Sequence, residues 1–150
     1  GAHWDASLCV SLAHGSGVSC RRLLPHSEWV SSVDVSSCGR WLMSGSLDST
    51  SMLWHIADPK AGGGMHSIDQ YPTHVLRGHS DAVLCVGISS IMRLAASGSR
   101  DGTVALYTLR DGKRVHVMRE PNGASVEQLL LADSGHVLFS GTAGSRLHLF

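Results

Sequence analysis

Two stretches of this 150-residue chain repeat each other in the same order. Four polar or aromatic positions of the first stretch each recur 53 residues later: His26 as His79, Ser44 as Ser97, Asp48 as Asp101, and Trp54 as Tyr107. Several features that return in one order at one spacing do not arise by chance. An internal repeat of this length limits the chain to repeat architectures.

Weaker copies flank these two and give the basic period. Ser140-Gly141-Thr142 repeats Ser97-Gly98-Ser99 43 residues later, and Asp5 precedes Asp48 by the same 43 residues. The copy that begins at Pro25 is about ten residues longer, and its excess coincides with a Gly- and Pro-rich stretch that disfavours helix and strand. We therefore predict a surface loop at about residues 58–72, inserted between two strands.

Each copy consists of short segments typical of β-strands. Apolar runs separated by Gly, Ser and Asp turns predict strands at residues 30–35, 40–46, 51–56, 82–89, 93–99, 103–109 and 114–118. Asp101-Gly102 and Asp111-Gly112 are hairpin signals. No apolar period of 3.6 residues is sustained, so helix should be nearly absent. Four strands in about 43 residues is typical of one blade of a β-propeller.

The predicted fold class is therefore all-β, a β-propeller fragment of about three and a half four-stranded blades. We expect blade pieces at about residues 1–20, 21–73, 74–116 and 117–150. The first piece opens inside a blade and the last stops within a strand. We therefore expect the chain to be part of a longer protein, since propellers close with four to eight blades.

The composition argues against several classes of function. Twelve Lys and Arg balance 12 Asp and Glu, so there is no basic footprint for nucleic acid. No apolar run approaches the ~20 residues of a transmembrane helix, so no direct membrane insertion is expected. The four cysteines form no CxxC pair and no secretory signal is present, which disfavours a disulfide framework. The histidines lack zinc-ligand spacing and the Gly clusters lack phosphate-loop residues, so we expect neither metal nor cofactor.

The residue pattern of the repeats resembles that of WD40 β-propellers, and the resemblance spans nearly the whole chain. It rests on Gly78-His79, on the Ser-Gly-Ser-Arg-Asp-Gly-Thr segment at residues 97–103, and on Tyr107. A narrower resemblance is also present. His3-Trp4-Asp5-Ala6-Ser7 is similar to a His-Trp-Asp-Asn-Ser segment in the C-terminal propeller of neurobeachin-type BEACH-domain proteins, and residues 71–86 are similar to a later blade of that propeller.

The chain departs from the WD40 pattern at several positions. The closing Trp-Asp is altered to Trp54-His55 and to Tyr107-Thr108, and Pro25 replaces the usual Gly before His26. In the fourth piece, Asn122 and Gly144 stand where the family has its His and Asp. That piece should therefore lack the polar network of the other copies.

The recurrent Ser, His and Asp admit two explanations. A Ser/His/Asp hydrolase would need them at one exposed cleft, but a catalytic centre has no reason to recur at a fixed period. The WD40 resemblance instead implies a buried structural hydrogen-bond chain from the aromatic residue through Ser and His to Asp. Its predicted members are His26, Ser44, Asp48, Trp54, His79, Ser97, Asp101 and Tyr107. Ser46 or Ser99 is an alternative to Ser44 or Ser97, since residues two apart share a strand face.

A candidate protein-binding surface follows from the same topology. The entry to the first strand of a blade and the turn that carries the Asp open on one face. We therefore predict that Trp29, Leu47, Ala82 and Arg100 lie around the mouth of the channel. Trp and Arg are enriched among the residues that dominate interfaces. The alternative is that Trp29 packs under a neighbouring loop.

These patterns predict binding, with no catalysis. We expect a non-catalytic scaffold that contacts other proteins. The neurobeachin-type resemblance implies a large cytoplasmic scaffold in vesicle trafficking, recruited peripherally to endomembranes. Two alternatives stay open: a WD40 scaffold or adaptor of another pathway, such as a ubiquitin ligase, and the Ser/His/Asp hydrolase.

Overall fold

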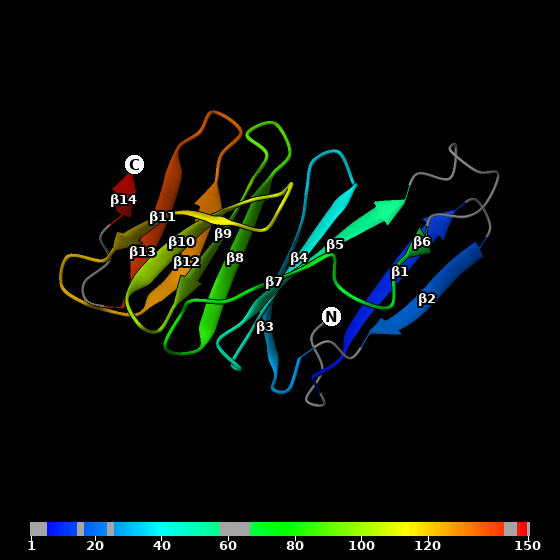
Figure 1. Cartoon of the computed structure of the whole chain (residues 1–150), viewed down its shortest axis with the longest axis horizontal. Coiled ribbons are helices and arrows are strands. Elements are labelled where there is room, and N and C mark those ends of the chain that lie inside the picture. Colours follow the sequence, from blue (N-terminus) through cyan, green and yellow to red (C-terminus); the bar gives the residue numbers. More distant parts are fainter. Residues whose placement is uncertain (1–5, 15–16, 24–25, 58–66, 143–146, 150) are drawn as a thin grey trace.

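The chain is built from consecutive antiparallel sheets. The computed structural model describes residues 6–14, 17–23, 26–57, 67–142 and 147–149, which form strands, turns and bends and no helix. Four sheets follow one another in chain order and stand side by side as a row of twisted layers (Figure 1). This is the arrangement of successive blades in a β-propeller, so the predicted all-β class and partial propeller are confirmed.

We number the sheets as blades 1 to 4 in chain order. Blade 1 comprises β1 (Leu8–His14) and β2 (Gly17–Leu23). Blade 2 comprises β3 (Val30–Val35), β4 (Trp41–Ser46), β5 (Ser51–Ala57), β6 (Ser67–Ile68) and β7 (His74–Leu76). Blade 3 comprises β8 (Val83–Ser89), β9 (Leu94–Ser99), β10 (Thr103–Thr108) and β11 (Arg114–Arg119). Blade 4 comprises β12 (Val126–Leu131), β13 (Val137–Gly141) and β14 (Leu147–Leu149).

The blade boundaries differ from the repeat boundaries. Strand β7 pairs with β5, so His74–Leu76 closes blade 2 and does not open the predicted third piece. The predicted boundaries after residues 20 and 116 fall inside β2 and β11. The physical reason is that an outer strand hydrogen-bonds back to the strand before it, whereas a sequence repeat marks only where similar residues recur.

The predicted loop at residues 58–72 contains a strand. Residues 58–66 lie outside the described part of the chain, but Ser67–Ile68 forms β6 and pairs with Ala57 and Ile56 of β5. The start of β5 pairs along the same sheet with β7, from Ser51 opposite Leu76. The loop prediction is therefore wrong at β6, because the buried Ile68 side chain joins the apolar cluster around blade 2 and draws the chain back to the sheet.

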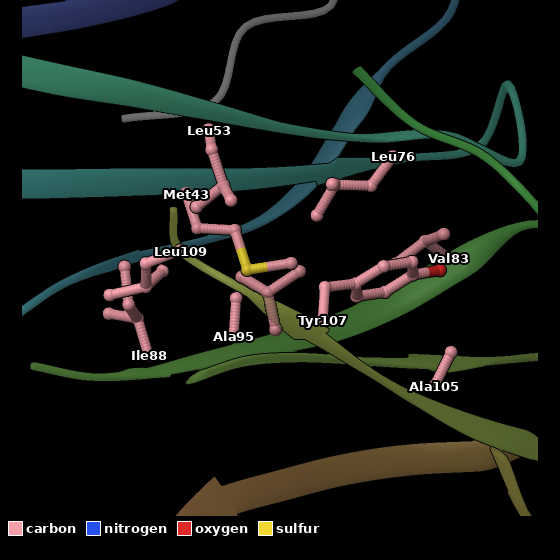
Figure 2. Close-up of a cluster of buried hydrophobic side chains, with 10 residues drawn as sticks. Met43, Leu53, Leu76, Val83, Ile88, Ala95, Ala105, Tyr107 and Leu109 are labelled. Carbon is pink, nitrogen blue, oxygen red and sulfur yellow. The ribbon is translucent and has the colours of Figure 1, made fainter. Parts of the chain in front are cut away.

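Apolar side chains fill the interfaces between the blades. In the largest cluster, Met43 and Leu53 of blade 2 meet Ile88, Ala95 and Tyr107 of blade 3 (Figure 2). A second cluster joins blades 3 and 4, and a third joins blades 1 and 2. Burial of apolar area is the main favourable contribution to folding, so contact between blades stabilises each of them.

Adjacent blades approach most closely where glycine leaves room. A Cβ atom at Gly45 of β4 would lie 2.7 Å from Cγ1 of Val83 in blade 3. A Cβ atom at Gly98 of β9 would lie 2.6 Å from Sγ of Cys85 and 2.7 Å from Cγ1 of Val126 in blade 4. These distances are too short for carbon, so the glycine of each Ser-Gly-Ser segment sets the spacing between two blades.

Strand β3 leaves apolar side chains exposed on the side toward blade 1. Ser32 Oγ and Asp34 Oδ2 accept hydrogen bonds from the amides of Val86 and Ile88 in blade 3. Strand alternation therefore turns Val33 and Val35 the other way, and both are exposed.

Candidate functional site

A His, a Ser and an Asp form the same buried cluster in blades 2 and 3. In blade 2, His26 Nε2 lies 2.7 Å from Ser44 Oγ and His26 Nδ1 lies 3.0 Å from Asp48 Oδ2. In blade 3 the corresponding distances from His79 are 2.7 Å to Ser97 Oγ and 3.2 Å to Asp101 Oδ2. The His precedes the first strand of its blade, the Ser lies in the second strand, and the Asp lies in the following turn.

Each cluster also contains a threonine that the sequence analysis did not identify. Thr50 Oγ1 donates to Asp48 Oδ1 over 2.6 Å, and Thr103 Oγ1 donates to Asp101 Oδ1 over 2.5 Å. Each threonine hydroxyl also lies 3.3 Å (Thr50) or 3.0 Å (Thr103) from Nδ1 of its histidine. The signal was available, because the two threonines recur at the same 53-residue spacing as the rest of the set.

Backbone amides complete the shell around each carboxylate. Asp48 accepts the amides of Ser27 at 3.1 Å and Thr50 at 2.9 Å. Burial by itself raises the pKa of the Asp48 carboxyl, but hydrogen bonds from the Thr50 hydroxyl and amide and from the Ser27 amide outweigh it. The pKa of Asp48 therefore lies below its ordinary value, as does the pKa of Asp101 for the same reasons. Both carboxylates are ionised structural acceptors that fix the turn between two strands.

The two serines of each Ser-Gly-Ser segment have different roles. Ser44 contacts the histidine, whereas Ser46 Oγ donates to the carbonyl of Glu28 and accepts the amide of Asp48. Ser97 and Ser99 repeat this division in blade 3. The structure thus places Ser44 and Ser97 beside the histidines, and Ser46 and Ser99 at the turns.

The aromatic ends of the predicted chains are not hydrogen-bonded. Trp54 Nε1 and Tyr107 OH are buried and have no hydrogen-bond partner in the described part of the chain. The predicted bond from the aromatic residue to the serine is therefore wrong for Trp54. In blade 3 the Ser97 side chain still lies close enough to the Tyr107 hydroxyl to lower its pKa, against the larger opposite effect of burial. Each ring instead packs in an apolar cluster between blades. Burial raises the pKa of the Tyr107 phenol.

The Ser-His-Asp geometry resembles that of an activated nucleophile, but its burial opposes that use. A nucleophilic Ser must reach a substrate carbonyl while its His takes the proton. The Ser44 and Ser97 residues are both 0% exposed, so a substrate has no approach to either hydroxyl. The clusters therefore act as buried polar networks that hold the turns.

The four predicted surface residues divide between surface and core. Trp29 is 47% exposed and Arg100 is also exposed, while Leu47 is half-buried. The amide of Leu47 donates to the Trp29 carbonyl over 3.0 Å, so these two residues are neighbours as predicted from the topology. Ala82 is 4% exposed, which corrects its assignment to a binding surface. Its methyl group is small enough to be covered, whereas the Trp29 indole at the equivalent position is not.

Glu120 takes over the polar role in blade 4. Its buried carboxylate accepts the amides of Asn122 at 2.7 Å and Ala124 at 2.9 Å. The turn at residues 121–124 is therefore held by a local carboxylate in place of a histidine network. Gly144, the other predicted departure, lies outside the described residues. No repeat position pointed to Glu120, since Arg77 stands 43 residues earlier.

Within the described residues, no three His, Cys, Asp or Glu side chains are grouped to hold a metal ion. Cys9, Cys38 and Cys85 carry free thiols, and burial raises the pKa of Cys85 to about 12. In the same part of the chain, no helix is long and apolar enough to cross a bilayer.

Acidification should weaken the fold through His26. Burial lowers the pKa of the His26 ring below its ordinary 6.5 and outweighs the attraction of Asp48, so the folded state favours the neutral ring. The unfolded chain therefore gains a proton first as the pH falls through 6.5, and the free energy of unfolding should decrease there. Urea titrations of the wild type and His26→Gln between about pH 7.5 and pH 5.5 measure this decrease. Equal pH slopes for the two proteins would contradict it.

Comparison with known proteins points to one family. The family model described as the neurobeachin beta propeller domain matches residues 1–150. BEACH domain-containing protein B of Arabidopsis thaliana is 31% identical over 161 positions, which cover 99% of this chain and 6% of that protein. BEACH domain-containing protein lvsD of Dictyostelium discoideum is 28% identical over 98 positions, covering 65% of this chain and 3% of that protein.

A third relative extends the likeness to another group. The guanine nucleotide-binding protein subunit beta of Arabidopsis thaliana is 31% identical over 125 positions, which cover 80% of this chain and 30% of that protein. The chain thus spans only a small part of each of these three relatives.

Proposed function

The chain belongs to the neurobeachin beta-propeller family, and we propose that it is a non-catalytic scaffold surface for other proteins in membrane trafficking. Two BEACH domain-containing relatives support the family context. The fold supports the role, because packed blades present their connecting turns as a rigid face. We further propose that the protein works in the cytoplasm and is recruited to endomembranes through its parent protein.

The observation that carries the proposal is the exposed indole of Trp29 beside the turn of blade 2. Large aromatic side chains are enriched among interface residues that dominate affinity, and Arg is enriched with them. The Trp29 backbone is fixed by its hydrogen bond to Leu47, and Arg100 occupies the equivalent turn of blade 3, where its amide bonds to the Ala82 carbonyl. A rigid backbone lowers the ordering entropy that binding must overcome.

The test is to remove both side chains and measure partner binding. Trp29→Ala with Arg100→Ala should weaken partner association by about tenfold and leave the melting temperature nearly unchanged, because both side chains are exposed. Affinity capture with the longest natural form of the protein, followed by titration of the recovered partner, measures binding, and thermal unfolding of the same variants measures the melting temperature.

A matched control is the pair Ile91→Ala with Arg110→Ala, an exposed apolar and an exposed basic residue at the other end of the blade-3 strands. This control should leave partner binding intact. A lower melting temperature with intact binding would place Trp29 in a structural role and contradict the proposal. Recovery of ubiquitin-ligase components in place of trafficking proteins would favour the alternative pathway.

A further inference from the structure

A polar pocket of about 380 Å³ lies on blade 3, beside the His79 cluster and away from Trp29. Small or apolar side chains line part of it, including Ala105 and Val117, and two arginines of the outer strand, Arg114 and Arg119, complete the lining. His79 and Asp101 form its inner end. The pocket therefore has two arginines of one strand in its lining.

A β-bulge places Arg114 in the pocket. Along the β10–β11 pair, Thr103 lies opposite Arg119 and Ala105 lies opposite Val117. Regular pairing would then set Val115 opposite Tyr107, but the register shifts there and Arg114 takes that position. Bulges re-aim side chains in this way, and they are frequent next to functional sites. Val115, the displaced residue, is exposed.

The backbone opposite Arg114 is shaped to receive it. An Nη1 atom of Arg114 lies 3.4 Å from the Gly78 carbonyl oxygen, to which it donates. A Cβ atom at Gly78 would lie 2.4 Å from the same nitrogen, and the φ of +136° at Gly78 also favours glycine. The guanidinium is thus held at the pocket by one carbonyl, and its other donors stay available.

The carboxylate of Asp101, the acidic group in the pocket lining, already accepts several hydrogen bonds. The Asp101 carboxylate accepts the hydroxyl and amide of Thr103, the amide of Ser80 and the ring of His79. The Arg119 backbone pairs with Thr103 in the sheet, whereas its exposed side chain makes no hydrogen bond or ion pair with any described residue. The charge that remains to be matched in this pocket is therefore positive.

We propose that this pocket binds an anionic side chain of a protein partner, either a carboxylate or a phosphorylated hydroxyl. Two guanidinium groups from one strand offer paired N–H donors that suit the planar carboxylate or the phosphate oxygens. The floor of Ala105, Thr103 and Val117 leaves space for the stem of such a side chain. The inference rests on the proposed role in protein binding and names the chemistry of one contact.

The experiment measures direct binding of defined probes to the longest natural form of the protein. Three fluorescent peptide pools share degenerate flanks and differ only at the centre, which is phosphoserine, glutamate or serine. Anisotropy should rise with the phosphoserine pool, the glutamate pool or both, and not with the serine pool. The pool that binds identifies phosphate or carboxylate as the group recognised.

Two variants and one control locate the contact. Arg114→Ala with Arg119→Ala should weaken binding of the anionic pool by about tenfold or more. Arg119→Ala alone should weaken it severalfold without loss of melting temperature, since that exposed side chain has no partner among the described residues. Arg110→Ala removes the same charge from the β10–β11 turn, outside the pocket lining, and should leave binding unchanged.

Equal binding of all three pools, or unchanged affinity in both arginine variants, would overturn the pocket assignment. Partner capture that still depends on Trp29 would then leave the proposed scaffold function standing. If the wild type and every variant captured no protein partner, that result would instead count against the scaffold function itself. The two failures are therefore distinguishable.

Discussion

Gly98→Val should lower the free energy of unfolding by about 3 kcal/mol, because Cys85 of blade 3 and Val126 of blade 4 leave no space for a side chain there. The first added carbon would already lie 2.6 Å from Cys85 Sγ and 2.7 Å from Val126 Cγ1. Cys85 is the cross-strand neighbour of Gly98 within blade 3, and Val126 lies in blade 4. Both are buried in the cluster that joins the two blades, so relief requires the sheet and the blade interface to shift together. Urea unfolding of Gly98→Val, with Gly98→Ala as a smaller step, measures the loss.

The compensating variant tests the cause of this loss. Gly98→Ala should destabilise less in a Val126→Ala background than in the wild type, since the nearest carbon of blade 4 is then gone. The same destabilisation in both backgrounds would attribute the effect to the Cys85 contact within blade 3 or to backbone conformation, and not to contact with blade 4. Gly45→Val tests the same effect on the free energy of unfolding at the interface between blades 2 and 3, where Val83 is the nearest side chain.

Asp101→Ala and His79→Ala should each lower the free energy of unfolding by about 2–3 kcal/mol, since each strands a buried hydrogen-bonding group. The loss of Asp101 removes the acceptor for Thr103, Ser80 and His79 together. The loss of His79 leaves the fully buried Ser97 hydroxyl without its partner at 2.7 Å. Denaturant melts of both single variants and the double variant provide the measurement.

The double variant and an exposed control variant make this prediction specific to a buried network. The double variant should lose less than the sum of the single losses, because the residues share one network. Asp111→Ala removes an exposed carboxylate that pairs with Thr108 and Lys113 in the next turn, and it should leave the free energy of unfolding nearly unchanged. Strictly additive losses, or an equal loss for Asp111→Ala, would contradict a buried network.

The repeat predicted most of the strands and the polar centre of each cluster. Strand 30–35 was predicted at its observed bounds, and strand 40–46 differs from β4 by one residue. Turn chemistry acts locally at the ends of both strands, so the residues themselves specify these elements. Burial alternates with period two along β3, whereas β4 is buried along almost its whole length. His26 and Asp48 were predictable because the same contact must form twice in two similar blades.

What the sequence left undetermined depends on contacts between distant residues. Trp54 and Tyr107 have the right positions to reach a serine, but packing against neighbouring blades sets their orientation. Ala82 is covered and Trp29 is not, although both follow the histidine by three residues. The bulge that turns Arg114 into the pocket has no local signal, since its cause is the pairing of β11 with β10.

The outer edge of blade 2 offers a place where the chain can grow. The segment that follows Ala57 returns at Ser67, and these two residues are direct cross-strand partners. Whatever lies between them therefore begins and ends at one point of a sheet that β7 completes independently. Loop-closure entropy rises slowly with length, so substitution of this segment by a longer one, or by a folded module with adjacent termini, places little strain on the propeller. This edge is a natural attachment point for a reporter domain.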